Sequence, residues 1–104
     1  MSKRLRDCAP YLRLLLSGNR IQSEAILVTA SDKQVECVSE IIRNIFQLPV
    51  GKRTRQLLID HKKILSALAD KNNTVRKRLD ILQKSHIKIL DVLLSVKSKL
   101  LPLL

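Results

Sequence analysis

The residues with the clearest chemical potential are lysines and arginines concentrated between positions 52 and 84. They are Lys52, Arg53, Arg55, Lys62, Lys63, Arg76, Lys77, Arg78 and Lys84. Cationic side chains at this density can neutralise phosphates and release the counterions condensed on a nucleic acid. We therefore predict a nucleic-acid-binding site at these nine residues, with double-stranded DNA as the partner.

The same stretch offers little for reading base sequence. Base recognition needs Arg, Asn or Gln presented at consecutive exposed helical turns. Asn72, Asn73, Arg76 and Gln83 are available, but the two asparagines are better explained as turn and cap residues. A helix-turn-helix over residues 52–84 fits in outline. Any two basic amphipathic helices would also fit, so we expect sequence-independent binding or condensation of DNA.

No arrangement of residues indicates catalysis. His61 and His86 are far apart, and neither has the i, i+4 partner of a helical zinc motif. Gly18 and Gly51 are isolated, which excludes a glycine-rich phosphate loop. The carboxylates are scattered singly, without a close pair for general acid and base work. We predict a non-enzymatic protein that holds neither a metal ion nor a cofactor.

The charge of the chain is large and unevenly placed. The formal net charge of the 104 residues is +11. Residues 1–51 hold seven bases and five acids, a net of +2, whereas residues 52–104 hold thirteen bases and four acids, a net of +9. A solubilising surface is the plainer explanation of a charge run, but this asymmetry favours a polyanionic partner.

Two predicted helices position the basic residues, joined at Lys71-Asn72-Asn73. Their apolar stripes have the three- and four-residue spacing of a helix. The stripes are Leu57, Leu58, Ile64, Leu65 and Leu68 in the first helix, and Val75, Leu79 and Leu82 in the second. We expect Arg76, Lys77, Arg78 and Lys84 to point away from the buried side. A kink or break is expected near Ser85.

The rest of the chain is also helical, because two glycines and three prolines leave little for hairpins and 45% of residues are hydrophobic. We predict one all-α domain over residues 1–104, a bundle of five or six helices. Residues 1–18 are considered a loosely attached N-terminal helix, which either contains Pro10 or begins near Ala9 so that Pro10 lies in its first turn.

The central helices carry clearer signals. A short helix near residues 20–29 has a candidate core of Ile21, Ala25, Leu27 and Val28. Ser31 and Gln34 form a capping-box pattern at the start of the next helix. That helix presents one apolar face, formed by Val35, Val38, Ile41, Ile42, Ile45 and Phe46. We interpret it as scaffold.

The C-terminal helix supplies an alternative function. Its apolar face, represented by Ile87, Leu90, Leu94 and Leu101, fits a bundle core, a seam between copies in a homo-oligomer, or a docking face for a capsid component or another acidic protein. Lys88, Asp91, Lys97 and Lys99 argue against a membrane span. The alternative is thus a helical protein–protein interaction module.

Two cysteines, Cys8 and Cys37, are too few and too far apart for a metal or redox motif. Their spacing permits a disulfide, but we expect two reduced, partly buried thiols. The basic N-terminus is followed by no clean apolar segment, since Arg13 interrupts it, so we expect no signal peptide. The expected location is intracellular and soluble, in the nucleus of a host cell or in a virion.

Between about Ile26 and Leu101 the chain resembles the small basic helical proteins of Maverick/Polinton-type elements and of the related adintoviruses and adomaviruses. The resemblance covers the cap (Ala30, Ser31, Gln34), the next helix (Ser39, Glu40, Ile41, Asn44) and the central basic stretch (Leu58, His61, Lys62, Lys63, Leu65, Leu68, Ala69, Asp70, Lys71). A basic segment then leads into Leu82-Gln83-Lys84. Where that family usually has Gly-Gly-Phe, this chain has Ser85-His86-Ile87.

The resemblance implies an adenovirus-core-like protein, associated with the virion, that neutralises packaged double-stranded DNA. It assigns no chemical role to any residue and no cofactor. Its implication agrees with the charge asymmetry.

Overall fold

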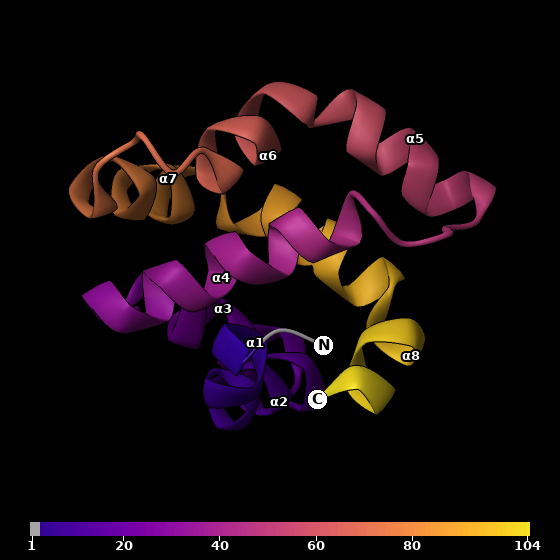
Figure 1. The fold of residues 1–104 in the computed structure, drawn as a ribbon, viewed down its shortest axis with the longest axis horizontal. Helices are drawn as coiled ribbons and strands as arrows, with labels where there is room; N and C mark the ends of the chain where they lie inside the picture. Colours follow the sequence, from indigo (N-terminus) through magenta and orange to yellow (C-terminus); the bar gives the residue numbers. More distant parts are fainter. Residues whose placement is uncertain (1–2) are drawn as a thin grey trace.

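The computed structural model describes residues 3–104, and these form eight α-helices and one short 3₁₀ helix without a strand (Figure 1). In chain order they are α1 (Lys3–Asp7), α2 (Ala9–Ser17), α3 (Arg20–Val28), α4 (Asp32–Ile45), α5 (Lys52–Asp60), α6 (Lys62–Ala69), α7 (Val75–Ser95), α8 (Lys97–Leu100) and η1 (Leu101–Leu103). The all-α class is confirmed. The helices are more numerous than the five or six predicted, because several expected helices are interrupted.

Helix α4 crosses the middle of the molecule, with α5 and α6 on one side and α1–α3 on the other (Figure 1). It packs against α6 and α7 as well as α1 and α2, while α3 packs against α7. This position makes α4 the centre of the core. The largest fully buried side chains include Leu5, Leu12, Leu15, Leu16, Leu27, Ile41, Ile42, Ile45, Leu65, Leu68, Leu82 and Ile89.

Helix boundaries follow local capping chemistry. Ser31 and Gln34 form the expected capping box at the start of α4, and Thr74 caps α7 by accepting a hydrogen bond from the Lys77 amide. Pro10 lies in the first turn of α2, where its missing N–H is no loss. A second capping box, between Asn19 and Gln22 at the start of α3, was not predicted.

Two bends lie next to each other in the basic half. The expected helix over residues 52–69 is divided at His61, where the backbone has φ −113° and ψ 19°. Helix α7 bends at Ser85, with φ −126° and ψ 23°, as expected. Lys63 and Ser85 line the same surface hollow, so the bends are adjacent. Helix α6 therefore contacts the first part of α7, while Thr54 of α5 bonds to Ser95 near its end.

Some predicted core positions are exposed. Ile21 and Ala25 face solvent, and the buried residue of α3 beside Leu27 is Ser23, whose hydroxyl donates to the Leu15 carbonyl over 2.6 Å. Phe46, the residue that follows the end of α4, is also exposed. A serine that bonds to the preceding helix can thus replace an aliphatic contact on the inner face of a short helix.

The N-terminal segment is firmly attached, contrary to expectation. Leu5 and Leu12 are fully buried, and Cys8 forms a disulfide with Cys37 of α4. The Cα atoms of the two cysteines are 5.5 Å apart, because packing of α1 against α4 brings them together. The expectation of reduced thiols is therefore wrong.

The apolar face of the C-terminal helix is largely core. Leu90 is fully buried, Leu94 and Leu101 are half-buried, and only Ile87 is mainly exposed, at 53%. The second half of α7 is covered on several sides, since α3, α4 and α5 all pack against this helix. The prediction of an exposed docking face at these four residues is therefore wrong for Leu90, Leu94 and Leu101, and holds only for Ile87. Within residues 3–104, no helix has the length and apolar character needed to cross a membrane.

Candidate nucleic-acid interface

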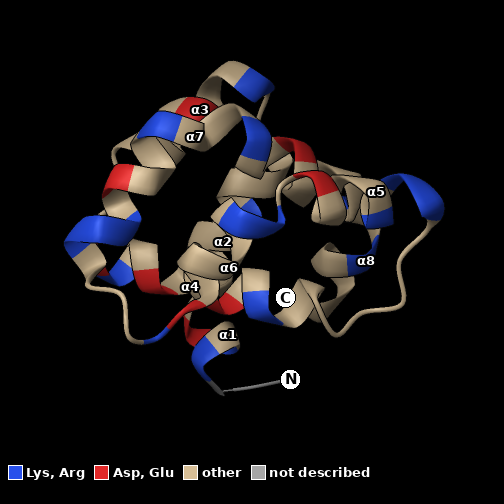
Figure 2. Cartoon of the chain, turned by 90° about the horizontal axis from the view of Figure 1, so that it is seen from above, with Lys and Arg blue, Asp and Glu red and all other residues tan. Residues whose placement is uncertain are grey.

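The predicted cations of α5 are exposed and without partners. Lys52, Arg53 and Arg55 occupy the first turn of the helix. None of their side chains forms an ion pair or hydrogen bond with the described part of the chain. In Figure 2, blue bands mark the α5 side of the molecule. This turn therefore presents three charges that no internal carboxylate balances.

The cations of α6 and of the start of α7 are similar. Lys62 and Lys63 begin α6, and Arg76 and Lys77 lie in the first turn of α7. All four are exposed, and residues 3–104 supply no ion-pair partner to any of them. Seven of the nine predicted site residues are thus available to an external anion.

These seven cations lie at the N-terminal ends of α5, α6 and α7, where the helix dipole is also positive. No acid occupies the first turn of α5, α6 or α7. Gly51 and His61, which precede α5 and α6, provide no side-chain capping bond. Cations here repel the helix dipole, whereas an anion would be attracted both to the side chains and to the positive end of the dipole.

Lys84 is exposed at its side chain but has a partner. Its Nζ lies 3.1 Å from a carboxylate oxygen of Asp80, one turn earlier in α7, and its side chain is 74% exposed. An exposed pair of this kind contributes little free energy and exchanges readily with other anions. Lys84 therefore remains a candidate contact of lower weight.

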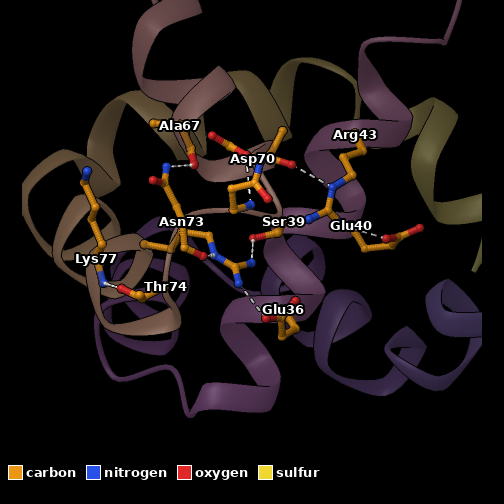
Figure 3. Close-up of polar contacts among 12 residues, drawn as sticks. Glu36, Ser39, Glu40, Arg43, Ala67, Asp70, Asn73, Thr74 and Lys77 are labelled. Carbon is orange, nitrogen blue, oxygen red and sulfur yellow. Dashed lines mark hydrogen bonds and ion pairs between the residues drawn. The ribbon is translucent and has the colours of Figure 1, made fainter.

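Arg78 was expected to point outward, and this prediction is wrong. The residue is only 3% exposed. Its guanidinium donates to Glu36 over 2.6 Å, to the Ser39 hydroxyl over 2.7 Å and to the Asn73 carbonyl over 3.2 Å. Figure 3 shows the acceptors converging from α4 and from the turn before α7. Arg78 thus joins the basic half to the scaffold and is excluded from the interface.

The Arg78 contact changes the acidity of its partner. The hydrogen bond from Arg78 lowers the pKa of Glu36, and the positive charges of Arg78, Arg43 and Arg4 act in the same direction. Partial burial of the carboxylate opposes this shift. Glu36 therefore stays ionised and paired under conditions that protonate an ordinary glutamate.

A second arginine, Arg43 of α4, holds the end of α6. Its Nε donates to the Ala69 carbonyl over 2.8 Å, and its Nη1 binds Glu40 at 2.9 Å. The Asn73 side chain donates to the Ala67 carbonyl over 2.8 Å (Figure 3). Carbonyls that the C-terminus of a helix leaves unpaired are thereby satisfied. Sequence reasoning missed Arg43, although its place in the last turn of α4 was visible.

The four acids of the basic half neutralise few of its cations. Asp91 forms an ion pair with Arg20 of α3 over 2.7 Å, so it neutralises a cation of residues 1–51. Asp60 accepts a hydrogen bond from the Gln56 amide, and Asp70 accepts one from the Asn72 backbone. Among the described residues, Asp80 alone of these four acids forms an ion pair with a cation of the same half, Lys84. Red bands lie among the blue ones in Figure 2, but residues 52–104 hold thirteen bases against four acids.

No group of three or more His, Cys, Asp or Glu side chains in residues 3–104 could hold a metal ion. His61 is half-buried at the bend between α5 and α6, and His86 Nδ1 lies 3.2 Å from the Gln83 carbonyl. His61 is the junction between α5 and α6, whereas His86 lies in α7, and neither forms an ion pair with a carboxylate of residues 3–104. Their surroundings are those of structural side chains.

Comparison of the chain with protein-family models, with curated proteins and with solved structures gives no match.

Proposed function

We propose that this protein binds double-stranded DNA without sequence preference, through Lys52, Arg53, Arg55, Lys62, Lys63, Arg76 and Lys77, with Lys84 as a further contact. The observation that carries the proposal is that these seven cations are exposed and have no carboxylate partner within residues 3–104. A surface of this kind gains free energy mainly by releasing counterions from phosphates.

The size of the molecule fits such a role. Its principal extents are 32 × 28 × 27 Å, and one turn of B-DNA is about 34 Å long. Helices α5 and α6 and the start of α7 lie along one side of the molecule (Figure 1). A single copy could therefore contact phosphates over about one turn of a duplex.

The proposed absence of sequence preference is supported by the hydrogen bonds that the candidate base-contacting side chains form within the fold. The Asn73 amide is bonded to the Ala67 carbonyl, and the Gln83 amide to the Val28 carbonyl. Of the four candidates, Arg76 and Asn72 have side chains without a bonding partner in the described part of the chain, and Asn72 lies in the turn before α7. Each of these side chains can contact about one base, so the two together are too few to read a base sequence along the duplex.

The resemblance to the proteins of Maverick/Polinton-type elements and their viral relatives makes a viral or transposon-derived setting part of this proposal. Of the two locations considered, the disulfide between Cys8 and Cys37 favours the virion over the nucleus. Disulfides persist in oxidising surroundings such as virions, whereas nuclear thiols are kept reduced.

The test is a titration of duplex DNA at several salt concentrations, with two unrelated sequences. We expect equal affinities for the two sequences and an affinity that falls steeply with salt. The double variant Lys62→Gln/Lys63→Gln should reduce the slope of log affinity against log salt by up to about 2, because each phosphate contact contributes about 0.9.

The matched control is Arg6→Gln/Lys33→Gln, which removes the same charge from exposed positions on α1 and α4. Its salt slope should equal that of the wild type. Equal losses in both double variants would show that net charge alone attracts DNA, and the proposed interface would be rejected. An unchanged slope in Lys62→Gln/Lys63→Gln would remove α6 from it.

A further inference from the structure

A hollow of about 240 Å³ lies between α6 and the first part of α7. Its floor is formed by Ile64 and Ala67 of α6 and Ile81 of α7, all half-buried. The exposed residues Lys63, Lys84 and Asp80 also line it, as does Ser85, where α7 bends. The hollow therefore combines an apolar floor with lysines contributed by both helices.

The size of the hollow restricts what it can bind. Small-molecule and cofactor sites are typically about 300–1,000 Å³ and enclose most of the ligand. This hollow is smaller, open to solvent, and has no convergent polar groups on its floor. Its dimensions suit a single aliphatic or aromatic side chain presented by another polypeptide.

The charges at the rim restrict the partner further. Lys63 has no carboxylate partner in residues 3–104, and the Lys84–Asp80 pair is exposed enough to exchange. Lys77 lies two turns before Lys84 in α7 and adds positive charge along the same helix. A segment with carboxylates on either side of its apolar residue would complement this rim.

A second hollow shows why the charged rim matters. Between α2 and α3, Leu14, Ala25 and Ile26 line a hollow of about 360 Å³. Its lining is also mainly apolar but contains no charged residue. Nothing there selects a partner by charge, so it serves as an internal control for the first hollow.

We propose that the α6–α7 hollow is a docking site for an acidic protein segment, which inserts one aliphatic or aromatic side chain over Ala67 and places flanking carboxylates on Lys63 and Lys84. The inference does not rest on DNA binding. Because Lys63 and Lys84 also belong to the proposed DNA interface, an acidic segment bound here competes with DNA for these two lysines.

The test uses two fluorescein-labelled probes, a short Asp/Glu peptide with one central leucine and the same peptide with serine in its place. We expect the leucine peptide to bind roughly 10- to 100-fold more tightly, because burial of one large apolar side chain contributes that factor. Amide chemical shifts that depend on the leucine should change at Ile64, Ala67 and Ile81.

Two substitutions complete the experiment. Ala67→Phe fills the hollow and should abolish the difference between the peptides, whereas Ala25→Phe fills the α2–α3 hollow and should leave it intact. Equal binding of both peptides to the wild type would overturn the proposal, as would leucine-dependent shifts at Leu14 and Ile26. If Ala67→Phe does not fold, the shift map of the wild type decides. Duplex titrations are run separately, so failure of either proposal is recognised independently.

Discussion

The central helix α4 and the basic helices α5–α7 place their charges in opposite ways. Helix α4 begins with Asp32 and has Arg43 in its last turn, so both charges are favourable to its dipole. Helices α5–α7 begin with cations and have no acid in their first turns. The comparison teaches that the charges of α4 suit its own dipole, whereas the first turns of α5–α7 carry cations without an acid to offset them, which is the arrangement that the proposed DNA partner would balance.

Removal of the disulfide should give the largest effect, and it tests whether the scaffold is separate from the interface. Cys8→Ser/Cys37→Ser opens a cross-link between residues 29 apart in sequence, and the loss of loop-closure constraint should lower the free energy of unfolding by about 3–4 kcal/mol. Urea denaturation measures this change. The salt slope of DNA binding at low temperature should not change, and a large change would link the two regions.

Two neighbouring arginines of α7 provide the next test. Arg78→Ala removes a buried guanidinium with three acceptors, and should lower the free energy of unfolding by about 2–4 kcal/mol. Arg76→Ala removes an exposed side chain and should change stability by less than about 0.5 kcal/mol, while weakening DNA binding. Similar stabilities of the two variants would contradict the buried position of Arg78.

Charge reversal at helix starts sharpens the comparison directly. Lys52→Glu should stabilise the free protein by about 0.3–1 kcal/mol, because an acid in the first turn of α5 favours its dipole, and should weaken DNA binding. Asp32→Lys should destabilise by a similar amount without affecting DNA. Thermal unfolding and DNA titration of both variants would check the opposite signs. If Lys52→Glu did not stabilise the protein and Asp32→Lys did not destabilise it, the helix dipole would not account for the charge placement.

The smallest expected effect is on how the free energy of unfolding changes at low pH. Since the pKa of Glu36 is lowered in the fold, its contribution to stability is present above its unfolded pKa and is lost as pH falls through the folded pKa. Its side chain is 38% exposed, so solvent screens the effect. Glu36→Gln should remove this part of the acid dependence of unfolding. If the free energy of unfolding of the wild type and of Glu36→Gln changed with pH in parallel, the Glu36–Arg78 pair would be excluded as a source of the acid dependence.

The sequence was sufficient for the all-α class, the Ser31 cap, the Thr74 cap and the bend at Ser85, because these depend on neighbouring residues. It also located the seven exposed cations. Arg78 was wrongly predicted to be exposed, because the prediction gave more weight to its being an arginine than to its position on the helix. It lies three residues after Val75 and four before Leu82, on the buried stripe of α7. Ser39 of α4 lies within the Val35–Ile42 stripe in the same way.

Other features depend on tertiary packing and could not be predicted. The disulfide requires α1 to pack on α4, and no local pattern near Cys8 or Cys37 indicates this. The contact of Arg43 with the end of α6 joins residues 26 apart. Burial of Leu90 follows from contacts of α7 with several helices at once, whereas periodicity reports only one apolar face.

The covalent ring closed by Cys8 and Cys37 contains α2, α3 and the beginning of α4, and every basic helix lies outside it. If heat or denaturant disrupts the noncovalent packing, the ring stays a compact, nearly neutral head. The remaining chain, from α5 onward, becomes a long cationic tail. Such a tail can still follow a duplex as a flexible polycation, so attraction to DNA should outlast the fold itself.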